Sequence, residues 1–586
     1  MRTTQDRPAA IPAHLQPFIA HQDASLYTPI DHACWRFILR VSTAFFDRHA
    51  HQKYRDGLRE TGISTERIPL VAEMDACLSR FGWRAVPVNG FIPPAAFMEF
   101  QSLGILPIAC EMRSLDHLAY TPAPDIVHEA AGHAPILADP EYAQYLRNYG
   151  EVARRAIVSS HDLNLYEAIR ALSEVKEDPA STPEQVRRAQ DTLERTVIAS
   201  EYVSEAAQLA RMNWWTVEYG LVGSLQQPKI YGAGLLSSVA ESGSCLGEAV
   251  RKLPLTLDCL QNSYDITRPQ PQLYVTPDFA TLTELLERVA ERMAFRRGGL
   301  EGLAKAKMAA AVTTSVLDSG VQVSGVLLDF ALDEQNRPCF LKLSGPTQLA
   351  WGDTQVPGQG PEQHRDGFSS PIGRLRGQGR SAADLTPDEV ASLDRLEFQS
   401  GIVVQGRVTS WLHRDGRMTL ISFADCTVSW GDRVLFRPEW GAYDLACGQR
   451  VVSVFGGAAD RGAYLQATAE PPPKARPART NLTEQNRALN ALYATVRRLR
   501  EDPVPQTELS QIELSQALRS VLGQLDAHHR DDWLLRLEVL ELALHRGLLP
   551  DGLAAVRQGL AELASASPDR ADLIARGLAL LDRAES

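Results

Sequence analysis

Two histidines that flank a short glutamate-containing segment constrain this chain more than any other feature. Residues 124–135 read PDIVHEAAGHAP, which places His128 and His133 five residues apart. Neutral imidazole binds Fe, Zn, Cu or Ni, so the pair predicts a metal site. A zinc-peptidase helix spaces its histidines four apart, whereas an interval of five leaves them roughly 140° apart on an ideal α-helix. A shared metal therefore needs a helix end, a π-helical turn or a local distortion, which Gly132 would permit.

A second segment supplies a candidate third ligand. Residues 213–221 read NWWTVEYGL, in which Glu218 is a lone carboxylate among aromatic and apolar residues. Such a group is costly to bury unless it is paired or bound to a metal. Two histidines and one carboxylate form the facial triad of non-haem Fe(II) oxygenases. The alternatives are capping or surface histidines, and a salt bridge from Glu218 to an arginine such as Arg211.

With YGAGLLSS at residues 231–238, these segments resemble the tetrahydropterin-dependent aromatic amino acid hydroxylases, the short bacterial phenylalanine hydroxylases being the nearest type. The resemblance runs from about residue 27 to residue 295. It implies a mainly α-helical catalytic domain with short strands, in which His128, His133 and Glu218 hold Fe(II). It also implies a reduced pterin, tetrahydrobiopterin or a related one, and O₂ as co-substrate. The implied reaction is hydroxylation of an aromatic amino acid ring, in the first place L-phenylalanine to L-tyrosine.

The same resemblance assigns a pterin site to the segment that follows Trp83. The backbone around Gly90, Phe91 and Ile92 would hydrogen-bond the pterin, and the ring of Phe97 would stack on it. Glu129 is implied as a catalytic residue beside the pterin and not as a metal ligand. Without the family context, Phe97 would be read as an ordinary core residue.

The substrate carboxylate is implied to bind Arg113, because a guanidinium fork matches carboxylate geometry. Thr121 and Ser237 would contact the same end of the substrate. The alternative is that Arg113 forms a surface ion pair with Glu111 or Asp116.

Three residues are implied to surround the aromatic ring of the substrate, namely Pro124, Trp214 and Ile266. Tyrosine-preferring members carry a polar residue at the position of Ile266, and an apolar side chain offers a tyrosine hydroxyl no partner. Tryptophan-preferring members tend to carry Phe at the position of Trp214. The pattern favours phenylalanine, with tryptophan hydroxylation as the alternative within the family.

Two other classes of function compete with a hydroxylase. A zinc hydrolase would use Glu129 as its base, but the five-residue spacing argues against it. A non-catalytic binding or assembly protein on the same scaffold would not need all three metal-ligand candidates.

Length and charge limit the remaining possibilities. A chain of 586 residues suggests two to four domains. The formal net charge of −12 disfavours nonspecific binding to nucleic acid or to an anionic membrane surface. The eight cysteines include no C-x-x-C pair, which favours buried thiols in a reducing cytoplasm.

The chain divides into segments with different patterns. We expect a flexible arm at 1–26, the catalytic domain at 27–300, a helical insertion at about 158–206, a β-rich domain at 315–470, a Pro-rich linker at 471–481 and a helical domain at 482–586. Within the β-rich part, turn signals predict hairpins around Asp333–Arg337 and at Asp415-Gly416. No catalytic cluster is evident beyond residue 300, and the C-terminal region is a candidate for homo-oligomer contacts.

Overall fold

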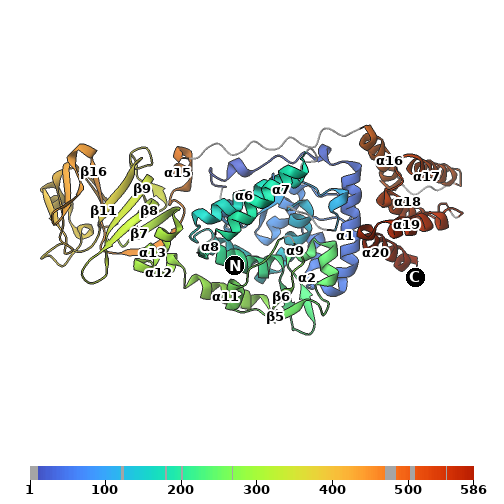
Figure 1. The fold of residues 1–586 in the computed structure, drawn as a ribbon, viewed down its shortest axis with the longest axis horizontal. Helices are drawn as coiled ribbons and strands as arrows, with labels where there is room; N and C mark the ends of the chain where they lie inside the picture. The colour runs from blue at the N-terminus through green and yellow to red at the C-terminus, as the bar shows by residue number, and fades with distance from the viewer. Residues whose placement is uncertain are drawn as a thin grey trace, which may run out of the picture.

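The structure is a computed structural model that describes residues 11–90, 92–119, 124–177, 181–199, 202–266, 268–468, 484–501, 508–549 and 551–585. Three parts follow one another along its longest axis (Figure 1). A helix-rich domain lies in the middle, a β-rich domain at one end and a C-terminal helical bundle at the other. The expected linker, residues 471–481, lies outside the described residues.

The helix-rich domain surrounds two small sheets. Strands β1 and β2 are parallel, and a second sheet has the order β4-β3-β6-β5. The strands of the two sheets are β1 Arg84–Val88, β2 Ile105–Ala109, β3 Leu221–Gly223, β4 Pro228–Ile230, β5 Arg251–Pro254 and β6 Gln272–Thr276. The α-helices of the helix-rich domain are α1 Pro29–His49, α2 Lys53–Glu60, α3 Val71–Leu78, α4 Pro94–Ser102, α5 Pro140–Ala153, α6 Ser160–Glu177, α7 Pro183–Ile198, α8 Glu205–Asn213, α9 Ala233–Leu236, α10 Val239–Ser244 and α11 Phe279–Ala290.

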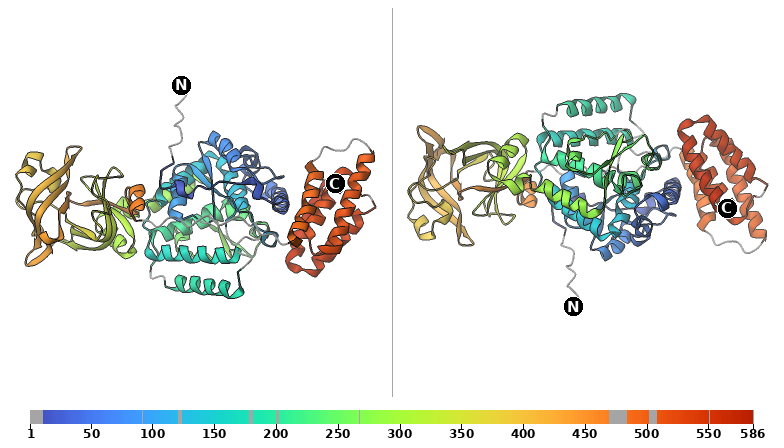
Figure 2. Two further views of the ribbon diagram at one scale, coloured as in Figure 1. Left: turned by 90° about the horizontal axis from the view of Figure 1, so that it is seen from above. Right: turned by 90° about the horizontal axis from the view of Figure 1, so that it is seen from below.

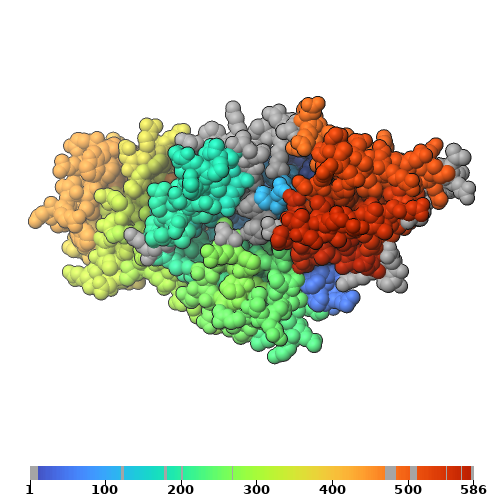
Figure 3. Space-filling model, turned by 45° about the vertical axis from the view of Figure 1, so that its right-hand side comes forward, coloured from blue at the N-terminus to red at the C-terminus, as the bar shows by residue number. Residues whose placement is uncertain are grey.

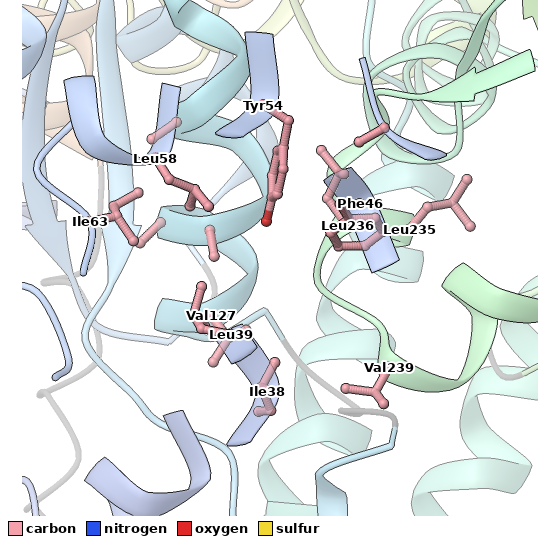
Figure 4. Close-up of a cluster of buried hydrophobic side chains, with 14 of the residues drawn as sticks. Ile38, Leu39, Phe46, Tyr54, Leu58, Ile63, Val127, Leu235, Leu236 and Val239 are labelled. Atoms are coloured by element: carbon pink, nitrogen blue, oxygen red, sulfur yellow. The ribbon is translucent and has the colours of Figure 1, made fainter. Parts of the chain in front are cut away.

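Helix α1 contributes many buried residues to the core. Its N-cap is Thr28, which exchanges hydrogen bonds with Asp31 in a capping box. Figure 4 shows its apolar residues Ile38 and Leu39 beside Val127, the residue that precedes His128. Burial of a large apolar side chain contributes about 1.5–3 kcal/mol. The long N-terminal helix thus supports the segment that carries the histidines.

Residues 11–26 pack against β1, whereas the sequence predicted a flexible arm at 1–26. The Ala20 amide donates to the Pro87 carbonyl, and Ile19 forms an antiparallel bridge with Val88 on β1. Leu15 is 1% exposed and packs in a small apolar cluster against Val88. The polar, proline-rich composition suggested a loose segment, but its few apolar residues are spaced to cover the sheet edge.

Helices α6 and α7 form a hairpin on the outside of the domain (Figure 2). A capping box between Thr182 and Gln185 starts α7. No residue of α7 is fully buried, although α6 buries Ala168 and Leu172. The hairpin falls within the expected insertion and adds surface rather than core.

The β-rich domain begins after α11. Short helices α12 Ala294–Arg297 and α13 Gly299–Ala309 lead into two antiparallel sheets, and α15 Arg461–Thr468 follows them. One sheet contains β7 Val312–Leu317, β8 Val321–Leu332, β9 Pro338–Trp351, β10 Thr354–Gln355, β11 Gly367–Pro371 and β17 Val451–Gly456; the other contains β12 Arg395–Glu397, β13 Ile402–Arg414, β14 Arg417–Trp430, β15 Arg433–Phe436 and β16 Tyr443–Ala446. A single-turn helix, α14 Pro387–Ala391, precedes β12. Both expected hairpins are present, with Asp415 and Gly416 at positive φ.

The C-terminal bundle packs on α1 through buried charges. Its helices are α16 Glu484–Glu501, α17 Glu508–His528, α18 Trp533–Arg546, α19 Leu553–Ala566 and α20 Pro568–Glu585. Arg36 donates from Nε and Nη2 to Glu538 at 3.0 and 2.6 Å, and both side chains are at most 5% exposed. Beside this pair, Phe37 and Trp533 meet edge to face at 5.0 Å. In Figure 3 the bundle stands against the helix-rich domain.

Two further findings concern the whole described chain. All eight cysteines are free thiols. Within the described ranges, no helix has the length and apolar character needed to span a membrane.

The ion pair at this junction gives the first prediction. Replacing Glu538 with leucine should weaken bundle docking by about 3–5 kcal/mol, because Arg36 keeps a buried charge without its carboxylate. Hydrogen exchange of the α18 amides measures the effect as faster exchange. The matched control is Glu184→Leu, which breaks an exposed pair with Arg188 and should change exchange little. Unchanged exchange in Glu538→Leu would show that the pair does not hold the bundle.

The same pair makes docking sensitive to acid. Burial would raise the pKa of Glu538, but Arg36 and Arg500 outweigh burial and hold the pKa below its ordinary value. A carboxyl group with a lowered pKa contributes stability above its unfolded value of about 4.3, and this stability is lost as pH falls through the lowered value.

Candidate metal centre

A π-helical turn, η5, carries both histidines. It spans Val127–His133, and its i→i+5 hydrogen bonding places residues five apart above one another. The Nε2 atoms of His128 and His133 lie 3.2 Å apart. The unusual interval in the sequence therefore matches the backbone geometry, and the requirement for a π-helical turn or similar distortion is confirmed.

Gly132 allows this turn to pack closely. A Cβ atom on Gly132 would lie 2.7 Å from the carbonyl oxygen of Ala233 in α9. Helix α9 also carries the chain into Ser237, so the close approach brings that residue to the histidines.

A second π-helical turn carries the carboxylate. Segment η7, Trp214–Glu218, follows α8 directly. Glu218 Oε2 lies 3.3 Å from His128 Nε2, and Oε1 lies 3.4 Å from His133 Nε2. The three ligand atoms lie within 4.8 Å of one another and form the one group of this kind found among the described residues.

Hydrogen bonds orient these ligands. His128 Nδ1 lies 3.0 Å from Ser237 Oγ, which itself donates to the Ala233 carbonyl at 2.8 Å. Ser237 therefore accepts from Nδ1–H, and Nε2 keeps its lone pair for a metal. Burial would raise the pKa of Glu218, but the two imidazoles outweigh burial and lower it, so the carboxylate stays charged.

Arg113 lies next to this centre and forms a buried ion pair. Its Nε and Nη2 donate to the two carboxylate oxygens of Asp125, each at 2.8 Å, and its Nη1 donates to the Ser237 carbonyl at 3.0 Å. Asp125 also accepts from the backbone amide of His128 at 3.0 Å. The alternative of a surface pair with Glu111 or Asp116 is therefore wrong. Of the other residues expected at the substrate, Pro124 is exposed and Thr121 lies outside the described residues.

The loop assigned to the pterin is tied to the histidine segment. Parallel β1 and β2 end side by side, so the Gly90 amide donates to Glu111 Oε1 at 2.8 Å. The Glu111 carbonyl then accepts from the Ile126 amide at 2.8 Å. Ile92 and Phe97 are half-buried beyond this loop, whereas Phe91 lies outside the described residues.

Glu129 projects from η5 as a buried acid. Its Oε2 lies 3.9 Å from His133 Nε2 and has no hydrogen-bond partner among the described residues. Burial, and then the charge of Glu218, raise the pKa of Glu129 to about 8 against the opposing effect of His133. A carboxyl group with a raised pKa keeps its proton to higher pH, and its protonated form can donate a hydrogen bond.

Trp214 is held between two aromatic rings. Tyr264 stacks on one side at 4.3 Å between ring centroids, and Tyr219 stacks at 4.6 Å. Tyr219 also donates to Glu241, which accepts from the Gln270 amide at 2.9 Å. Ile266 lies in the loop between Tyr264 and Gln270 and is half-buried. Sequence reasoning missed this stack, although Tyr264 stands only two residues before Ile266.

Comparison with known proteins shows what this region is similar to. A family model described as biopterin-dependent aromatic amino acid hydroxylase matches residues 22–158 and 193–297. The phenylalanine-4-hydroxylase of Pseudomonas aeruginosa is 28% identical over 263 residues, which cover 44% of this chain and 83% of that protein. That of Ralstonia nicotianae is 28% identical over 283 residues, covering 46% and 76%.

Residues 22–158 and 193–297 are thus similar to the biopterin-dependent aromatic amino acid hydroxylases. The resemblance read from the motifs is thereby confirmed. A structure of Chromobacterium violaceum phenylalanine hydroxylase with bound iron(III) and oxidised 7,8-dihydrobiopterin is 24% identical, with a TM-score of 0.37, covering 48% of this chain and 92% of that one. The family model leaves residues 159–192 of the hydroxylase domain unmatched, and these form most of the α6–α7 hairpin.

The packing of η5 gives the second prediction. Gly132→Ala should displace the π-helical turn, because the new methyl group would meet the Ala233 carbonyl at 2.7 Å. We expect the purified variant to hold much less iron than the unmodified protein, measured as iron per chain. Gly523→Ala is the matched control, since a Cβ there meets nothing within 4 Å. Full iron content in Gly132→Ala would show that the turn tolerates displacement.

Proposed function

We propose that this chain hydroxylates the ring of L-phenylalanine to give L-tyrosine, using Fe(II), a tetrahydropterin and O₂. The observation that carries the proposal is the convergence of His128, His133 and Glu218 within a region of the pterin-dependent family. Two imidazoles and one carboxylate suit iron and leave coordination positions open. The iron and pterin together supply the oxidising chemistry, and the protein supplies binding, orientation and electrostatics.

The residues around the metal ligands have separable roles. Ser237 fixes the tautomer of His128, and the Arg113–Asp125 pair holds the start of η5. Arg113 Nη1 and Nη2 each retain a second N–H, which can meet the substrate carboxylate. Glu129 is a buried carboxyl group with a raised pKa, and its protonated form would offer a hydrogen bond to the pterin.

Substrate choice rests on Trp214 and Ile266. The indole of Trp214 is fixed on both faces by Tyr219 and Tyr264, so it forms a rigid wall rather than an adaptable one. Ile266 gives a tyrosine hydroxyl no hydrogen-bond partner, and an unpaired buried hydroxyl is costly. Shape differences in an apolar pocket yield only about 10–200-fold discrimination, so side activity on tryptophan is expected.

The test is product formation from phenylalanine, tryptophan and tyrosine by iron-loaded protein at saturating tetrahydrobiopterin. We expect kcat/KM to be highest for phenylalanine. Trp214→Phe should narrow the gap to tryptophan, because it makes room for an indole. The control is Trp440→Phe, which changes an exposed tryptophan of the β-rich domain and should leave the ratio unchanged.

Two results would contradict this proposal at different levels. A higher kcat/KM for tryptophan in the unmodified protein would overturn the substrate but keep the reaction. No pterin-dependent product from any of the three amino acids would favour the non-catalytic alternative.

A further inference from the structure

Helix α4 is tethered to two segments that lie outside the centre of the hydroxylase domain. Arg461, the first residue of α15, donates from Nη1 to Glu99 Oε2 at 2.9 Å. The other oxygen of Glu99 lies 3.1 Å from His14 Nε2 in the N-terminal segment. All three side chains are at most 15% exposed. Glu99 is therefore gripped from the β-rich domain on one side and from residues near the N-terminus on the other.

Arg461 is held at the junction of the two domains. Its Nη2 donates to the carbonyl oxygens of Arg154, at the end of α5, and of Gly456, at the end of β17. The Gly456 amide donates to the Arg155 carbonyl at 2.9 Å. A Cβ atom on Gly456 would lie 2.1 Å from the Ala156 carbonyl oxygen, so the two backbones are in direct contact. The guanidinium reaches Glu99 from a rigid junction.

Glu99 and Phe97 lie on different faces of α4. Positions two residues apart on an α-helix are separated by about 200° around the helix axis. The face that carries Phe97 therefore points away from the face that carries Glu99. Helix α4 begins directly after the loop that contains Gly90 and Ile92. The ion pair with Arg461 thus holds the helix from the side opposite the residue assigned to the pterin.

Helix α4 also packs on α5 and β2, and the ion pair with Arg461 adds a charged contact on one face of it. The helix packs closely on α5, where a Cβ on Gly150 would lie 2.6 Å from the Ser102 amide and 2.7 Å from the Met98 carbonyl. This contact fixes the distance between the two helices. Burial would raise the pKa of Glu99, but His14 and Arg461 outweigh burial and lower it, so the tether is a charged one. Hydrogen bonds to charged groups are stronger than neutral ones.

We propose that Arg461 and Glu99 are positioning residues through which the β-rich domain sets the pterin affinity of the hydroxylase domain. The proposal rests on the pterin-dependent function argued above. The contact orients α4 and hence Phe97, whereas the iron ligands lie on η5 and η7 and do not touch it. The β-rich domain thereby acts on the cofactor without contributing a residue to its site.

The test uses the full-length iron-loaded protein and measures its dissociation constant for tetrahydrobiopterin by anaerobic calorimetry. Arg461→Ala and Glu99→Gln should each raise this constant by about tenfold, and the double variant should be no worse than either single one. Arg461→Lys keeps the charge but loses the guanidinium fork, so its dissociation constant should lie between those of the unmodified protein and Arg461→Ala. Iron content and the KM for phenylalanine at saturating pterin should stay within twofold.

The matched control is Arg337→Ala, which removes an exposed arginine that pairs with Asp333 in the same domain. It should leave pterin affinity unchanged. Unchanged affinity in both single variants would overturn the inference, and so would a parallel fall in pterin affinity, iron content and thermal stability, which marks a merely structural contact. If the unmodified protein does not bind tetrahydrobiopterin, the proposed function fails and the inference with it.

Discussion

The convergence of two π-helical turns on one point is the constraint on which the rest of the structure depends. A regular α-helix could not present both histidines of η5 to one metal, because the five-residue interval would separate them around the helix axis. A π-helical turn is less stable than an α-helical one and needs support from its surroundings. That support comes from α1 behind Val127, from α9 against Gly132 and from Asp125 at the His128 amide.

Residues that contact the candidate metal ligands also connect them to the Gly90 loop and to Arg113. Ser237 contacts His128 through its hydroxyl and Arg113 through its carbonyl. Glu111 connects the Gly90 loop to the start of the histidine segment. These hydrogen bonds join η5 to the Gly90 loop and to Arg113. The β-rich domain joins this arrangement at α4, and the C-terminal bundle joins it at α1.

Much of the site could be read from the sequence, because its chemistry depends on residue type and short-range spacing. His128, His133 and Glu218 are recognisable as ligand types, and the five-residue interval between the two histidines predicts a distorted helix. The carboxylate partner of Arg113 could not be assigned this way, because nothing in the local sequence pattern pairs Arg113 with Asp125. The Tyr264–Trp214 stack and the Arg461–Glu99 pair join residues far apart in the chain, where no local pattern exists. The packing of residues 11–26 was missed because composition outweighed the spacing of a few apolar residues.

The most direct test of the central claim is the iron content of single ligand variants, measured beside pterin-dependent hydroxylation in the same preparations. The account predicts that His128→Ala, His133→Ala and Glu218→Ala each stay folded but lose iron and product formation together, because the three side chains share one metal. Retention of one iron per chain in any of these variants would remove that residue from the centre and contradict the account.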